Sequence, residues 1–147
     1  MEPVDDIEAA KTPSRLKIAG GLGILAGVLI TLTGVQTLSG FVLSGIYLVG
    51  SLLLVLLGAG LAFAGGLLAR ARALGAIMQV TLGILAVILS SVWLLLSLAG
   101  RLVSLFALTS PFLAGTALAM ALASLKMCDE VNAARRRLAD KGLDLGV

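Results

Sequence analysis

The chain has no histidine, one cysteine and three prolines in its 147 residues. Without histidine, the side chain used most often for general acid–base catalysis is missing, and one cysteine cannot form an intrachain disulfide. From Ile18 to Leu125 the sequence also has no aspartate, glutamate or lysine. We therefore predict that the protein is not an enzyme, and that it has no catalytic residue, cofactor-binding site or metal site.

What the chain does have is apolar sequence. Hydrophobic residues make up 59% of it and charged residues 13%, and its mean hydropathy is +1.11. A soluble domain is typically about 45–50% apolar and about 25% charged. Since a charge at the bilayer centre costs ~3 kcal/mol or more, this composition predicts an all-α integral membrane protein whose first partner is the lipid bilayer. The net charge of +3 does not indicate nucleic-acid binding, because the basic residues cluster at the ends of apolar runs.

The order of polar and apolar segments predicts the domain organisation. We expect a polar leader, a transmembrane domain and a basic tail that starts as a helix, at residues 1–17, 18–125 and 126–147. A helix needs about 20 apolar residues to cross a bilayer core. Polar and small residues divide the apolar region into four such spans, at about 18–38, 45–69, 74–98 and 102–125. Short connections make sequential helices antiparallel neighbours, which predicts an up-down four-helix bundle.

The two halves of the apolar region share a short motif. Residues 22–26 and 82–86 both read LGILA. This match is compatible with a tandem repeat of two helical hairpins in parallel orientation, related by a pseudo-two-fold axis along the membrane normal. Leucine, glycine and alanine are so common in this chain that chance can also produce the match, and both interpretations stay open.

Basic residues predict the orientation in the membrane, because cytoplasmic loops carry an excess of lysine and arginine. Only Arg101 lies on the opposite side of the predicted bundle, so we expect both termini in the cytoplasm. Much alanine, glycine, leucine and arginine with little lysine is typical of a GC-rich bacterium, which suggests a bacterial inner membrane. The residues expected to set topology or to contact lipid headgroups are Arg15, Lys17, Arg70, Arg72, Lys126, Arg135, Arg136 and Arg137.

Small residues recur at helical spacing in the predicted spans. Small side chains let membrane helices approach closely, as in small-xxx-small motifs. The face of the first span has two interpretations, packing within the protein's own bundle or a subunit interface of a homo-oligomer. That face consists of Gly20, Gly23, Gly27, Thr31 and Gly34. The other three spans have similar runs, which are Gly58, Ala62, Gly65, Gly66 and Ala69 in the second, Gly83, Ala86, Ser90 and Ser97 in the third, and Gly115, Ala119 and Ala123 in the fourth.

Two further residues stand out inside the spans. Pro111 removes a backbone hydrogen bond, so we expect a kink there, either a static one or a hinge, with Thr109 and Ser110 able to bond the freed carbonyls. Gln79 is the strongest polar residue within a span. It is expected either to bond across helices or to line a cavity.

Taken together, these features predict a non-enzymatic four-span membrane subunit that acts by packing, either on copies of itself or within a larger membrane complex. Its charged tail could also bind a cytoplasmic partner. The alternative is a small oligomeric channel or a transporter for ions or uncharged solutes, suggested by the serine and threonine content, Gln79 and Pro111. The two are distinguished by oligomeric state and by flux measurements.

Overall fold

The computed structural model describes residues 7, 9–40, 45–99 and 105–141. Nearly all of these residues are helical, and no strand occurs within these ranges. The prediction of an all-α protein is confirmed. Four long helices follow one another along the chain, α2 (Ser14–Gly40), α3 (Gly45–Ala69), α4 (Ala73–Ala99) and α5 (Leu105–Asp140).

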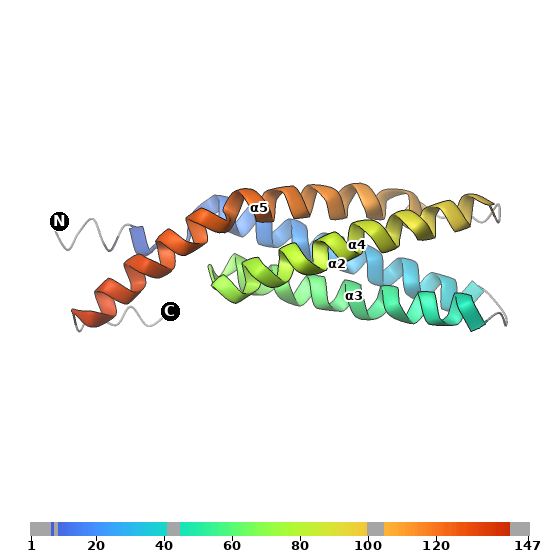
Figure 1. Cartoon of the computed structure of the whole chain (residues 1–147), viewed down its shortest axis with the longest axis horizontal. Coiled ribbons are helices and arrows are strands. Elements are labelled where there is room, and N and C mark those ends of the chain that lie inside the picture. Colours follow the sequence, from blue (N-terminus) through green and yellow to red (C-terminus); the bar gives the residue numbers. More distant parts are fainter. Residues whose placement is uncertain (1–6, 8, 41–44, 100–104, 142–147) are drawn as a thin grey trace.

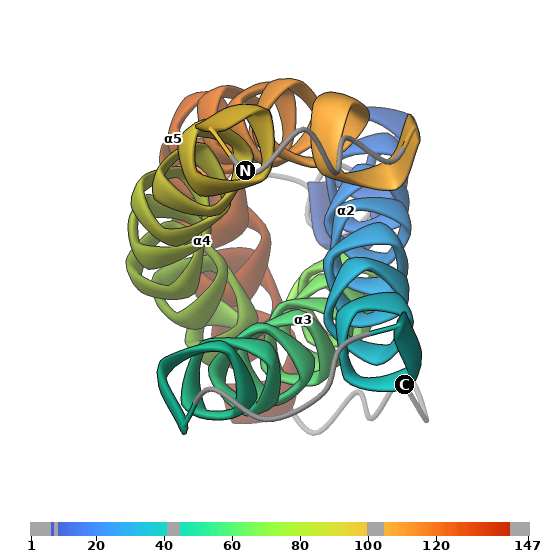
Figure 2. The ribbon, with the colours of Figure 1, turned by 90° about the vertical axis from the view of Figure 1, so that its right-hand side faces the viewer.

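The four helices form a closed ring in which each has two neighbours. Helix α2 packs on α3 and α5, helix α4 also packs on α3 and α5, and α2 and α4 lie diagonally across the bundle (Figure 2). Sequential helices run in opposite directions (Figure 1). The up-down antiparallel four-helix bundle predicted from the sequence is therefore confirmed.

Two helices extend beyond the expected spans. Helix α2 begins at Ser14, inside the predicted leader, and α5 continues to Asp140, well into the predicted tail. The expected start of the fourth span at residue 102 lies outside the described residues, as do residues 1–6 of the leader and 142–147 of the tail. The part of α5 from residue 126 to residue 140 is called the α5 extension below.

The outer surface of the bundle is lined by large apolar side chains. Leu56, Phe63, Leu95 and Phe112 are each more than 60% exposed. Water would solvate such a surface poorly, whereas lipid chains match it. All four helices are long and apolar enough to cross a membrane. The fold is that of a four-helix membrane protein.

The turn between α3 and α4 is tight and specific. The N–H of Ala71 donates to Leu68 O at 2.8 Å and the N–H of Arg72 donates to Leu67 O at 3.1 Å. Ala71 adopts a left-handed conformation with φ of 56°, at the position after a helix where glycine is most common. The side chain of Ala71 is fully buried, so surrounding contacts hold this alanine in a conformation that costs about 1–2 kcal/mol.

A tandem repeat of two hairpins would place α2 and α4 across the bundle from each other, as they are. The packing within the two hairpins differs, however. Gly20 and Gly27 in α2 correspond to Val80 and Val87 in α4, although Gly23 corresponds to Gly83, so α4 lacks two of the glycines that pack α2 against α3. The arrangement is compatible with a repeat, which stays a prediction.

Candidate functional site

The glycines of α2 bring its backbone against that of α3. A Cβ atom added to Gly20 would lie 2.5 Å from Gly65 O, and one added to Gly27 would meet Gly58 O. Gly34 faces α3 in the same way, one heptad further along. These distances are shorter than any real Cβ contact. Glycine is therefore required for two antiparallel helices to approach this closely.

The other two members of the predicted face complete the same packing. Thr31 Oγ1 donates to Gly27 O at 2.9 Å, and a Cβ atom on Gly58 would lie 2.5 Å from that hydroxyl. Gly23 faces the bundle centre, where an added Cβ would lie 2.7 Å from the Gln79 amide. All five residues of the α2 face thus contact α3 or α4 of the same molecule.

Helix α5 carries a run of small residues on its outer surface. A Cβ atom added to Gly115 would meet nothing within 4 Å, and Ala119 and Ala123 are exposed. The four-residue steps place these three side chains on one side of the helix, whereas Ala117 and Ala121 lie buried on the other. We call Gly115, Ala119 and Ala123 the outer α5 face. It has no partner among the described residues.

Gln79 connects three helices at the bundle centre. Its side chain is fully buried, and Nε2 donates to Ala19 O of α2 at 3.0 Å and to Ala117 O of α5 at 3.4 Å. Both acceptors are backbone carbonyls, which shows that α4 is tied to α2 and α5 by one amide group. Gln79 therefore bonds across helices in this structure.

Two buried polar atoms have no hydrogen-bond partner within the described ranges, Gln79 Oε1 and Ser51 Oγ. An unsatisfied buried polar group costs about 1–3 kcal/mol. Unpartnered polar atoms are uncommon inside a membrane bundle. These two are the atoms that a polar pathway through the bundle would supply with partners.

Helix α5 is continuous through Pro111. Proline cannot donate to the carbonyl four residues earlier, here that of Ala107, and the Ser110 hydroxyl donates to this oxygen at 3.4 Å. The clearest change of direction in α5 lies later, where it passes beyond the α3–α4 turn (Figure 1). Ser124 Oγ donates to Met120 O at 2.7 Å, a type of bond that often bends helices. A kink at Pro111 stays a prediction.

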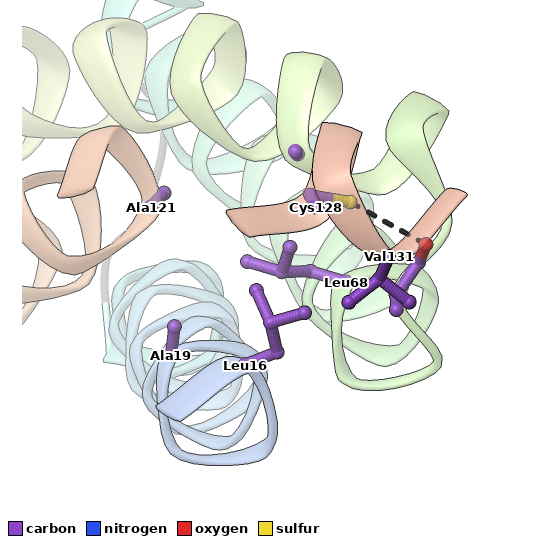
Figure 3. Close-up of a cluster of buried hydrophobic side chains, with 8 residues drawn as sticks. Leu16, Ala19, Leu68, Ala121, Cys128 and Val131 are labelled. Atoms are coloured by element: carbon purple, nitrogen blue, oxygen red, sulfur yellow. Dashed lines mark hydrogen bonds between the residues drawn. The ribbon is translucent and has the colours of Figure 1, made fainter. Parts of the chain in front are cut away.

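The α5 extension packs on the end of the bundle that carries the leader and the α3–α4 turn, which we call the charged end. Cys128 Sγ donates to Ala71 O at 3.4 Å, and Asn132 Nδ2 donates to the same oxygen at 2.9 Å. Leu16, Leu68 and Val131 point into the same cluster (Figure 3). The complete cluster consists of Leu16, Ala19, Leu68, Ala71, Ala76, Ala121, Cys128 and Val131.

Arg135 ties the α5 extension to two other segments. Its Nε donates to Ala10 O at 3.3 Å and its Nη2 donates to Thr12 Oγ1 at 3.0 Å. Its Nη1 donates to Arg70 O at 3.2 Å. The guanidinium group, with its fixed fork of donors, thus joins the leader, the α3–α4 turn and α5. The leader also packs on the extension through a small apolar cluster of Ala10, Ala134 and Leu138.

The other predicted topology residues have a different setting. Arg135 is half-buried, whereas the side chains of Arg15, Lys17, Arg70, Arg72, Lys126, Arg136 and Arg137 are exposed. The sequence pattern does not distinguish Arg135 from these residues, and it gives no signal for Asn132. The helical spacing of Cys128, Asn132 and Arg135 places them on one face, but only the fold shows which carbonyls that face meets.

The thiol of Cys128 lies in the buried cluster at the charged end. Burial raises the pKa of Cys128 above its usual value of 9.0, and the neighbouring Asp129 carboxylate raises it further. The hydrogen bond from Asn132 and the charge of Arg135 act in the opposite direction. The thiol therefore stays protonated at neutral pH. Within the described ranges, no three His, Cys, Asp or Glu side chains come together as a metal site would require.

Comparison of the chain with protein-family models, with curated proteins and with solved structures found no match. The class of protein therefore rests on its own sequence and fold. The sequence and the fold both indicate a helical membrane protein. The fold adds a glycine-packed hairpin, α2 and α3, and a helix, α5, that continues past the bundle.

Proposed function

We propose that the protein is a non-enzymatic membrane subunit that acts by packing, on copies of itself or within a larger membrane complex, through the outer α5 face. The observation that carries the proposal is the placement of Gly115, Ala119 and Ala123 on the outside of the bundle. Inside a membrane, small residues favour helix association because they permit close van der Waals contact. Gly20, Gly23, Gly27 and Gly34 cannot serve this purpose, since α3 and α4 already cover them.

The outer α5 face differs from the exposed faces of the other helices. Large residues such as Ile18, Leu56 and Ile88 project from α2, α3 and α4, and lipid chains accommodate them. On α5 the exposed residues between Phe112 and Lys126 are Thr116, Ala119, Leu122 and Ala123, so one leucine stands among three small side chains. A second helix can approach such a surface more closely than it can approach a row of leucines.

We also propose that the protein lies in a bacterial inner membrane with both termini in the cytoplasm. The exposed cations of the charged end support this orientation, since lysine and arginine are enriched on the cytoplasmic side. The α5 extension would then project into the cytoplasm, where it could also hold a cytoplasmic partner.

The test is the oligomeric state in mild detergent, measured by native mass spectrometry. Gly115→Leu adds bulk to the outer α5 face, and Gly21→Leu is its matched control, because both glycines face open space. We expect the wild type and Gly21→Leu to form the same oligomer or complex and Gly115→Leu to lose it. A wild-type protein that is strictly monomeric and co-purifies with no other membrane protein would contradict the proposal.

The alternative is a small channel or transporter for ions or uncharged solutes. The unpartnered Gln79 Oε1 and Ser51 Oγ favour it, because a polar pathway through the bundle would supply both atoms with partners. Flux of small solutes into reconstituted liposomes, with Gln79→Leu as the altered variant, tests this function. We expect a transporting protein to lose flux in the variant, and absence of flux in the wild type across ions and small solutes would exclude it.

A further inference from the structure

Five exposed cations lie at one level of the molecule, where the apolar helices end. Two of them are in the first turn of α2, two flank the α3–α4 turn, and the fifth is in α5. This fifth cation, Lys126, lies two residues before Cys128. Because the Cys128 thiol bonds the α3–α4 turn, Lys126 lies at the same level of the molecule as that turn. We call these residues the basic belt, and they are Arg15, Lys17, Arg70, Arg72 and Lys126.

No side chain among the described residues neutralises the positive charge of the basic belt. None of its five residues has an ion pair within the described part of the chain. The nearest acidic residues in sequence, Asp129 and Glu130, are in the next turn of α5 and are themselves exposed. The end of the bundle thus presents five cations beside apolar helix surfaces.

We propose that the basic belt binds the phosphate groups of anionic phospholipids in the surrounding leaflet. Charge complementarity and position both favour this ligand, because lipid phosphates lie just outside the hydrocarbon core, at the level where the apolar side chains stop. Long basic side chains at helix ends extend toward that layer. Each lysine or arginine near an anionic membrane surface strengthens binding about fivefold.

The structure separates the basic belt from the arginines of the α5 extension. Arg136 is ten residues beyond Lys126 in the same helix, which corresponds to about 15 Å along the helix axis, and to less along the bundle axis because α5 changes direction at the charged end (Figure 1). The headgroup layer is only about 5–8 Å thick on each side of a bilayer. Arg135 is already bonded to three backbone or hydroxyl oxygens. We therefore expect Arg136 and Arg137 to lie beyond the layer of lipid phosphates that the basic belt meets.

The experiment compares two pairs of substitutions that remove the same charge. Protein in micelles containing equal amounts of phosphatidylglycerol and phosphatidylcholine is repurified, and the lipids retained are counted by native mass spectrometry. We expect the wild type to be enriched in phosphatidylglycerol. The Arg70→Gln/Arg72→Gln variant should lose about fivefold of this enrichment per cation removed, whereas Arg136→Gln/Arg137→Gln should keep it. Circular dichroism melting in phosphatidylcholine checks that both variants fold.

Two outcomes would overturn the proposal. An equal loss of enrichment in both variants would show a general effect of net charge, and no enrichment in the wild type would show that the belt has no preference for anionic lipid. A third arm adds inorganic phosphate in place of phosphatidylglycerol. We expect no increase in the melting temperature, and an increase as large as that from the lipid would assign the site to free anions.

Discussion

The side-chain amide of Asn132 donates a hydrogen bond to the backbone oxygen of Ala71, 2.9 Å away. Within the described ranges Ala71 is the one non-glycine residue with positive φ. The α5 extension thus holds a strained turn that connects α3 and α4, across 61 residues of sequence. Loss of this bond should weaken both the turn and the attachment of the extension.

We expect Asn132→Leu to lower the free energy of unfolding by about 1–2 kcal/mol, because a leucine of similar size leaves the buried Ala71 carbonyl with only the weak Cys128 thiol donor. Thermal unfolding in detergent measures the change. Ala133→Leu, at the neighbouring exposed position, is the control and should melt like the wild type. Equal melting of Asn132→Leu and the wild type would contradict the role given to this bond.

Replacement of Arg135 should release the leader. Arg135→Met keeps an apolar stem but removes the three hydrogen bonds to Ala10, Thr12 and Arg70. We expect faster hydrogen exchange in residues 9–13, with little change in the spans. Arg136→Met, on the exposed side of the same helix, should leave the exchange of the leader unchanged. The prediction is wrong if both variants exchange alike.

The α2–α3 contact predicts that two glycine substitutions in one helix differ in their effect on stability. Gly27→Ala forces a methyl group against Gly58 O and the Ala62 backbone, and we expect a loss of about 1–3 kcal/mol, as for overpacked cores. Gly21→Ala meets no atom within 4 Å and should change stability by less than about 0.5 kcal/mol. Detergent unfolding of the two variants gives the comparison, and similar losses in both would contradict the packing described.

The bonds of Gln79 predict that glutamate is worse than leucine at this position. Gln79→Leu removes two interhelical hydrogen bonds, which in membranes are worth about 0.6–1.7 kcal/mol each, but it also removes the unpartnered Oε1. These effects oppose each other, so we expect a change within about 1 kcal/mol. Gln79→Glu places a carboxylate against the carbonyls of Ala19 and Ala117 and should destabilise strongly. The melting temperatures of the two variants at neutral pH show which of them is less stable, and we expect the lower value for Gln79→Glu.

The raised pKa of Cys128 makes stability depend on pH in the alkaline range. The folded protein holds the thiol proton more tightly than the unfolded chain does. The stability that the protonated thiol contributes to the folded state is fully present below pH 9.0, the usual pKa of the thiol. It is lost as the pH rises through the higher pKa of the thiol in the folded state. We expect Cys128→Ala to remove this part of the alkaline loss of stability. Maleimide labelling of the wild type should be slow at pH 8 and become fast when detergent unfolding exposes the thiol.

Several features of the fold could be predicted because they depend only on local sequence. The lack of charge between Ile18 and Leu125 predicts membrane helices, and the paired arginines Arg70 and Arg72 mark the turn between α3 and α4. Gly20, Gly27 and Gly34 could be assigned to one face from their spacing alone. Which helix this face meets could not be predicted, because small residues occur in all four helices and any pair of them could pack.

The charged end was the part least accessible to sequence reasoning. Asn132 and Arg135 lie in a tail whose charges have an ordinary explanation in membrane topology. Their partners are backbone carbonyls and a threonine hydroxyl, which leave no residue-type signal in the sequence. The same applies to Gln79, whose acceptors, Ala19 O and Ala117 O, could belong to any residue type.

By itself, the sequence determined that the helices lie in a lipid bilayer and that four segments are long enough to cross it. The free energy of transferring a segment into hydrocarbon depends on its composition and length, and not on which helices touch. Only the tertiary structure decided that Gly20, Gly27 and Gly34 pack against α3, that the outer α5 face is left open, and that Arg135 bonds within the protein while the cations of the basic belt stay exposed. These outcomes depend on distances between residues far apart in the chain, and no local pattern encodes such distances.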